Sequence, residues 1–139
     1  MTVLVTGGAG YIGSHMVLAL VDAGEEVVVL DNLSTGFRWA VHPQAQFHEG
    51  DVGDMGLVGN LIRQYGIDAV VHFAGSIIVP ESVENPLKYY LNNTAKSRDL
   101  IEACVRSGVK HFIFSSTAAV YGMPETSPVT EDMNLTPIS

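Results

Sequence analysis

The sequence predicts an α/β fold in which helices cover both faces of a doubly wound parallel sheet. Two observations predict it. Short apolar runs rich in β-branched residues alternate along the chain with longer stretches of helical periodicity, and the connections between them are short. Strands and helices that alternate in this way form a parallel sheet with right-handed crossovers.

The first half of the chain is expected to hold three strands and two helices. The strands are predicted over 2–6, 26–30 and 46–49, and the helices over 11–23 and 54–65. The strand at 26–30 is apolar on both faces, as strands of parallel sheets are. Helical spacing predicts an apolar face on each helix, made of Ile12, Met16, Ala19, Leu20 and Ala23 in the first and of Leu57, Val58, Leu61 and Ile62 in the second.

The second half continues the alternation. We expect strands over 68–73 and 109–115, a loop over 74–86, and a long helix over 87–107 that Gly108 stops. The inward face predicted for this helix is Leu91, Ala95, Ile101, Cys104 and Val105. After Ser116, prolines up to Pro137 break regular structure, and no further strand or helix is predicted. The sheet is therefore expected to stop after about five strands, within one domain over 1–139.

Composition narrows the classes of function. The 139 residues carry a formal net charge of −8, and 47% of them are apolar. An acidic chain is not expected to bind nucleic acid or an anionic membrane, and no apolar run approaches the about 20 residues that span a bilayer. The single cysteine, Cys104, excludes an internal disulfide and favours a reducing, cytoplasmic location. The beginning of the chain lacks the basic segment of a signal peptide, and no metal site is expected from the spacing of the histidines.

Three glycines between the first strand and the first helix predict a phosphate-binding loop. Gly7, Gly10 and Gly13 form the pattern G-x-x-G-x-x-G. A sharp turn, a close approach of the backbone to a pyrophosphate, and tight packing of helix on strand each require a residue without a side chain. The free N–H groups and the positive end of the helix then bind the phosphates. The position of the motif in a strand–loop–helix unit favours a dinucleotide site and a Rossmann-like fold over an ordinary turn.

Asp31 closes the second strand 18 residues after Gly13. A carboxylate at this position accepts hydrogen bonds from the adenosine ribose hydroxyls and repels a 2′-phosphate. No arginine follows until Arg38, so the sequence favours NAD over NADP. The alternative is an aspartate that starts an Asx-turn at the end of a strand.

Several segments resemble a known family in order and at matching intervals. They are residues 7–15 (GGAGYIGSH), 31–36, 50–52, 72–75, 81–83, 86–87, 89–94 and 114–117. Together they resemble the extended short-chain dehydrogenase/reductases, and among them the UDP-glucose 4-epimerases. The resemblance covers essentially the whole chain.

The resemblance implies a set of NAD contacts that follows the cofactor from one end to the other. In that order the residues are Asp51 and Val52 beside the adenine, Asp31 and Asn32 at its ribose, Gly7, Gly10, Tyr11, Ile12 and Gly13 at the pyrophosphate, Phe73, Ala74 and Gly75 beneath the cofactor, and Asn93 and Ser115 near the nicotinamide. Val52 and Phe73 would be apolar in any such sheet. Asn93 lies in the middle of a predicted helix, where asparagine is a poor helix former, and this favours a functional role.

The resemblance also implies a reaction on a UDP-hexose substrate. In the family, a tyrosine phenolate takes the proton of the sugar 4-hydroxyl while bound NAD takes the C4 hydride, and UDP-glucose and UDP-galactose interconvert through a 4-keto intermediate. Thr117 would be the catalytic hydroxyl that holds the substrate oxygen; the alternative is a threonine that caps the backbone. Related dehydratases carry an acid pair directly after this position, whereas Ala118 and Ala119 follow here, which favours epimerisation.

One motif of the family is absent from the chain. The catalytic tyrosine and lysine lie in Tyr-x-x-x-Lys, and none of the five tyrosines has a lysine four residues later. We therefore expect an incomplete, N-terminal NAD-binding portion that is catalytically incompetent alone. The alternatives are a non-catalytic nucleotide-binding module, or another NAD-dependent sugar-nucleotide epimerase or dehydratase.

Three further expectations concern the surface of the protein. Full-length relatives are expected to be homodimers. The strand at 109–115 is expected to be an exposed edge, so that residues 112–114 lack a neighbour. Where some family members carry a lysine that contacts the cofactor, this chain has Ile77.

Overall fold

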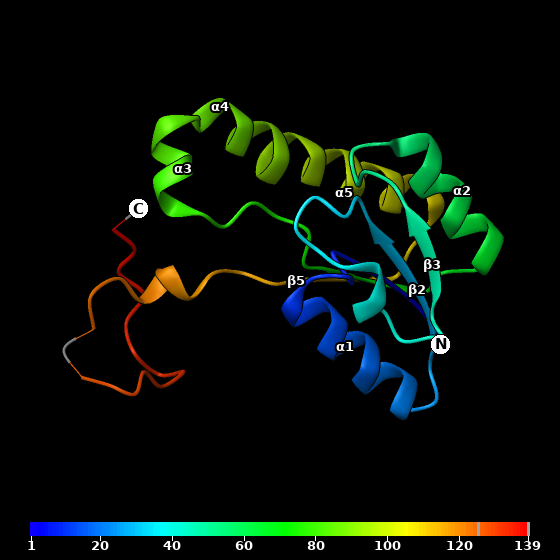
Figure 1. Ribbon diagram of the computed structural model, residues 1–139, viewed down its shortest axis with the longest axis horizontal. Helices are drawn as coiled ribbons and strands as arrows, with labels where there is room; N and C mark the ends of the chain where they lie inside the picture. Colours follow the sequence, from blue (N-terminus) through cyan, green and yellow to red (C-terminus); the bar gives the residue numbers. More distant parts are fainter. Residues whose placement is uncertain (125, 139) are drawn as a thin grey trace.

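A computed structural model describes residues 1–124 and 126–138 and contains one parallel sheet with helices on both faces (Figure 1). Its strands are β1 (Thr2–Thr6), β2 (Glu26–Asp31), β3 (Gln46–Glu49), β4 (Ala69–His72) and β5 (His111–Phe114). They lie in the order β3-β2-β1-β4-β5, and every pair is parallel. The predicted fold class is confirmed.

The helices cover the sheet from opposite sides, with α1 on one side and α2 and α5 on the other (Figure 1). Their bounds are α1 (Tyr11–Asp22), α2 (Met55–Tyr65), α3 (Val79–Glu84), α4 (Pro86–Tyr89) and α5 (Lys96–Ser107), with a π-helical segment η2 (Tyr90–Ala95) and two 3₁₀ turns, η1 (Arg38–Ala40) and η3 (Ala118–Tyr121). In the described ranges, no helix is long and apolar enough to cross a membrane.

Alternating residues of β1 divide the core into two layers. Leu4 faces α2 and α5, where Val58 and Leu100 are fully buried. Val5 faces α1, where Val17 is fully buried. Cys104 belongs to the first layer, and burial raises the pKa of its thiol to about 11, so it behaves as a small hydrophobic residue.

A buried polar group sits at the carboxyl end of β4. Nδ1 of His72 lies 2.6 Å from Oγ1 of Thr6 on β1, and Nε2 lies 2.9 Å from Oγ of Ser97 on α5. His72 is 1% exposed, and burial lowers its pKa below the ordinary value. The neutral imidazole therefore links β4 to the neighbouring strand β1 and to the helix α5.

The loop predicted over 74–86 is wrong in its second part, because residues 79–84 form the short helix α3. Pro80 lies in the first turn of α3, where a missing N–H breaks no helical hydrogen bond. Asn85 then separates α3 from α4, and its side chain accepts the Lys88 N–H. Pro80 thus lies at the start of α3 and Pro86 at the start of α4, where proline is compatible with a helix. Beyond Ser116, where no helix was predicted, the short turn η3 forms.

The predicted helix faces are partly wrong. On α1 the buried residues are Gly13 and Val17, while Ile12 is 60% exposed. On α5 they are Leu100, Ala103 and Cys104, whereas the predicted Leu91, Ala95, Ile101 and Val105 are exposed. The π-helical segment η2 is wider than an α-helical turn, so a count of 3.6 residues per turn does not carry across it. The predicted face of α2 is confirmed, with Val58, Leu61 and Ile62 buried and Leu57 packed against them.

Within the part of the chain that the structure describes, the strand β5 forms one edge of the sheet and pairs with β4 alone. Phe112 is half-buried against the core, but Ile113 is 57% and Phe114 61% exposed. The expected exposed edge is confirmed. After β5 the described part of the chain runs away from the sheet (Figure 1, orange to red).

Candidate functional site

A cleft of about 720 Å³ lies at the carboxyl ends of the strands. Most of the residues predicted to bind a cofactor line it, namely Gly7, Gly10, Tyr11, Ile12, Gly13, Asp31, Asn32, Asp51, Val52, Phe73, Ala74 and Gly75. Parallel α/β sheets bind ligands at this end, where the connections from neighbouring strands diverge to opposite faces. The order of the strands places this divergence between β1 and β4.

Two of the three motif glycines after β1, Gly7 and Gly13, leave no room for a side chain. Gly7 has a left-handed φ of 71°, and a Cβ there would lie 2.7 Å from the Ala74 nitrogen. A Cβ on Gly13 would lie 2.1 Å from the Gly7 carbonyl oxygen, so α1 packs against the loop only because residue 13 is glycine. Gly10 has an extended backbone that any residue can adopt, and it borders the cleft at the start of α1. Since α1 has no side-chain cap, its first N–H groups are open to a ligand.

Asp31 ties the ends of two strands together. Its Oδ2 accepts the Ala9 N–H of the glycine loop at 2.9 Å, and its Oδ1 accepts the Leu33 N–H at 2.8 Å. The second bond is the Asx-turn that the sequence left as an alternative, and it supports Leu33 at a φ of 55°. Asp31 therefore shapes the loop, and its remaining lone pairs border the cleft.

Asp51, just beyond the end of β3, is held by the start of α5. Oδ2 of Asp51 lies 2.5 Å from Nζ of Lys96, and Oδ1 accepts the Gly53 N–H at 2.8 Å. Partial burial alone would raise the pKa of Asp51, but the Lys96 ammonium and the Gly53 N–H outweigh burial and lower the pKa below its ordinary value. The carboxylate is therefore ionised over the physiological range.

Asn93 lies outside the lining of the cleft and holds one of its walls. Its Oδ1 accepts the Ser76 N–H at 2.8 Å, and its Nδ2 donates to the Ser76 carbonyl at 2.9 Å. The side chain thereby fixes the segment that follows β4. Asn93 belongs to η2, and π-helical turns are frequent at functional sites.

Ser115 and Thr117 also lie outside the cleft lining. The Ser115 N–H donates to the His72 carbonyl and so extends the pairing of β5 with β4. Oγ1 of Thr117 accepts the Ala119 N–H at 3.1 Å, which is the backbone cap that the sequence left as an alternative. This bond uses the oxygen of Thr117 as an acceptor, so its hydroxyl hydrogen remains able to donate.

Among the wall residues of the cleft that were not predicted, Glu81, Lys88 and Tyr89 form a cluster. Lys88 pairs with Glu81, and the Tyr89 hydroxyl lies 2.8 Å from Glu81 Oε2. Desolvation and the bond to Glu81 raise the pKa of Tyr89, which makes it unsuited to act as a base near neutrality. Lys88 and Tyr89 follow Glu81 by seven and eight residues. The three side chains meet only because the chain turns between α3 and α4.

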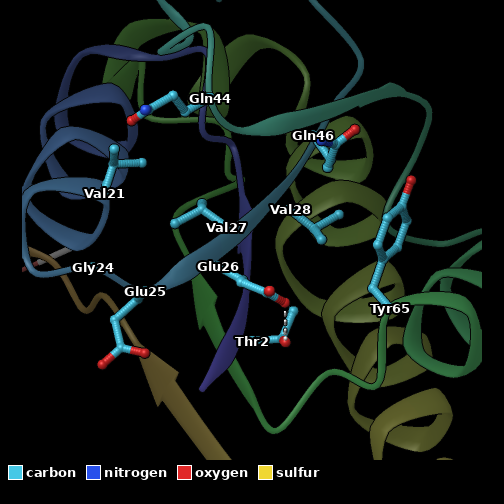
Figure 2. Close-up of a pocket in the computed structure, with 10 residues that line it drawn as sticks. All are labelled: Thr2, Val21, Gly24, Glu25, Glu26, Val27, Val28, Gln44, Gln46 and Tyr65. Carbon is cyan, nitrogen blue, oxygen red and sulfur yellow. Dashed lines mark hydrogen bonds between the residues drawn. The ribbon is translucent and has the colours of Figure 1, made fainter.

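A second cavity of about 540 Å³ opens at the amino ends of β1 and β2 (Figure 2). Figure 2 shows Thr2 donating to Glu26 across its floor, a bond of 3.1 Å. None of the predicted site residues lines this cavity. The cleft at the opposite ends of the strands is therefore the candidate site.

Comparison with known proteins agrees with this geometry. The UDP-glucose 4-epimerase of Azospirillum brasilense is 55% identical over 137 residues, which are 99% of this chain and 39% of that protein. The crystal structure of UDP-glucose 4-epimerase from Brucella ovis in complex with NAD matches with a TM-score of 0.88 at 44% identity, over 99% of this chain and 42% of that one. The enzyme from Thermotoga maritima with UDP-glucose matches with a TM-score of 0.87 at 37% identity, over 99% of this chain and 45% of that one.

The chain spans about two-fifths of the length of these relatives. A family model, the NAD dependent epimerase/dehydratase family, matches residues 3–139. The chain belongs to this family of NAD-dependent epimerases and dehydratases.

Proposed function

We propose that the chain binds NAD and forms the cofactor-binding part of a UDP-glucose 4-epimerase, which interconverts UDP-glucose and UDP-galactose. One observation carries the proposal. Three features follow one another along the cleft on adjacent strands: the glycine loop after β1, Asp31 at the end of β2, and Asp51 beyond β3. Neighbouring strands are about 4.8 Å apart, so this row has the spacing of a pyrophosphate, a ribose and a base.

The residues present fit NAD. The uncapped start of α1 beside Gly10 suits a pyrophosphate, because N–H groups and a positive helix end face it. Asp31 suits ribose hydroxyls and disfavours a 2′-phosphate. Arg38 is the first arginine after Asp31 in the sequence. Its guanidinium lies 4.4 Å from the centre of the Phe47 ring. Because this contact engages Arg38, it supports NAD over NADP.

The remaining proposed NAD contacts come from residues that follow β4 and β5, the strands on the other side of β1. Phe73, Ala74 and Gly75 follow β4 and would lie beneath the nicotinamide half, and Ser115 follows β5. Asn93 would act on that half through Ser76, which it holds. Lys88 brings an ammonium to the same wall of the cleft, and Ile77 stands where some family members carry a lysine.

When bound, NAD would supply the hydride acceptor for C4 of the sugar. The Thr117 hydroxyl would donate to the substrate oxygen, with its own oxygen held by the Ala119 N–H. Ala118 and Ala119 offer no acid or base beside it, which supports epimerisation over the elimination of water. The reaction on a UDP-hexose supports a cytoplasmic location, as does the buried, unpaired Cys104.

Calorimetric titration of the 139-residue chain with NAD tests the proposal. Gly10→Val places a branched side chain at the start of α1, where the pyrophosphate would approach, and should weaken NAD binding at least about tenfold. Gly24→Asn is the matched control, because Gly24 has a φ of 78° that asparagine tolerates and no atom near its Cβ position. Absence of NAD binding, or equal binding by wild type and Gly10→Val, would contradict the assignment.

A further inference from the structure

Lys96 is a wall residue of the cleft that the proposed contacts do not use. It is the first residue of α5, its side chain is 25% exposed, and its ammonium contacts Asp51 across 45 positions of sequence. Gly53 makes room for it, since a Cβ at residue 53 would lie 2.8 Å from Cγ of Lys96. The chain thus provides space for a lysine at this point of the cleft.

Lys96 and Gly53 together hold both oxygens of Asp51. Lys96 holds Oδ2 and the Gly53 N–H holds Oδ1, so the carboxylate has one orientation. The Asn32 side chain is a further donor near this carboxylate. A carboxylate has about four acceptor positions, so at least one remains open, and the Asp51 side chain, 35% exposed, borders the cleft. An ion pair as exposed as Lys96–Asp51 adds little stability. We therefore attribute to this pair the fixed direction of the Asp51 acceptor.

We propose that Lys96 is a positioning residue that orients Asp51 to accept the exocyclic amino group of adenine, and so sets a preference for adenine over its deaminated counterpart. The inference rests on the proposed NAD site and deepens it. Adenine presents an N–H donor to the carboxylate. Hypoxanthine presents a carbonyl oxygen at the same place, and two acceptors that face each other repel. The lowered pKa of Asp51 supports the proposal, since only the ionised carboxylate is purely an acceptor.

A paired titration with NAD and nicotinamide hypoxanthine dinucleotide tests this role. The quantity compared is the ratio of the two dissociation constants for the 139-residue chain. Lys96→Met keeps the length of the stem and removes the ammonium, and Lys96→Arg keeps the charge. Lys110→Met is the matched control, because Lys110 is exposed and lies outside the cleft lining.

The expected result is a preference of about tenfold for NAD in the wild type, the size of one hydrogen bond to a charged group. Lys96→Met should reduce this ratio to within about twofold, while Lys96→Arg and Lys110→Met should retain it. A merely structural role of Lys96 would weaken both dinucleotides together and leave the ratio unchanged. If Lys96→Met does not fold, as judged by circular dichroism, Lys96→Gln replaces it.

An unchanged ratio in Lys96→Met or its replacement would overturn the inference. A wild-type chain that binds the two dinucleotides equally would overturn it too, while NAD binding and its loss in Gly10→Val would leave the proposed function intact. A wild-type chain that binds neither dinucleotide would overturn both.

Discussion

Asp31→Asn separates the two roles of Asp31, because it keeps the size of the side chain and removes one acceptor. In the folded chain Asp31 is 8% exposed and accepts two backbone N–H groups, from Ala9 and Leu33. An asparagine has one acceptor oxygen, so its NH₂ group must face one of these N–H donors in either orientation. The effect should therefore be visible without any ligand.

The magnitude follows from the bonds lost. A hydrogen bond to a charged group contributes about 1.5–3 kcal/mol, and Asp31→Asn loses one such bond and weakens the other. We expect the free energy of unfolding to fall by about 2–3 kcal/mol. For a chain of this length, about 3–5 °C of melting temperature corresponds to each kcal/mol, so the midpoint should fall by roughly 6–15 °C.

Urea denaturation followed by circular dichroism, in the absence of NAD, measures this change. Asp22→Asn is the control, because Asp22 is exposed at the end of α1 and its substitution should alter stability by less than about 0.5 kcal/mol. If Asp31→Asn matches this control, the bonds to Ala9 and Leu33 do not hold the loop, and the reasoning from geometry to loop shape is refuted.

Two further predictions concern the buried histidine and turnover. Burial lowers the pKa of His72, so the unfolded chain takes up its proton first as the pH falls through about 6.5; the free energy of unfolding should therefore decrease between pH 7.5 and 5.5, and less so in His72→Gln. Urea denaturation at the two pH values measures this, and equal decreases in both proteins would count against it. The purified 139-residue chain should not convert UDP-galactose to UDP-glucose, because none of its tyrosines is followed by lysine at the fourth position. A coupled assay that detects turnover by chain from an epimerase-deficient host would refute this prediction.

The strands and the glycine loop could be predicted because their signals are local. Buried parallel strands such as Glu26–Asp31 are short apolar runs, and glycine or aspartate marks their ends. The short helix α3 could not be found in this way, because Pro80 breaks or starts a helix according to its position in the first turn. The predicted buried face of α1 was partly wrong because Gly13 makes the close contact with the glycine loop. The predicted face of α5 was partly wrong because the π-helical segment η2 precedes it and shifts the periodicity.

Contacts between distant residues were beyond sequence reasoning. No sequence pattern links Lys96 to Asp51, and only the fold brings these two residues, 45 positions apart, together. Asp31 was predicted at the edge of the cofactor site, but its bond to Ala9 depends on how β1 and β2 end side by side. Asn93 was singled out as unfavourable in a helix, and its two bonds to Ser76 supply the reason for its presence.

The central place of β1 has a consequence for synthesis on the ribosome. β1 leaves the ribosome before its neighbours, and it pairs with β2 on one side and β4 on the other. The 41 positions from Asp31 to His72 separate the completion of these two partners, an interval of roughly 2–8 s at about 5–20 residues per second. During that time the backbone N–H and C=O groups of β1 on the side of β4 are unpaired, and such an open strand edge is where a chaperone or a neighbouring nascent chain would bind.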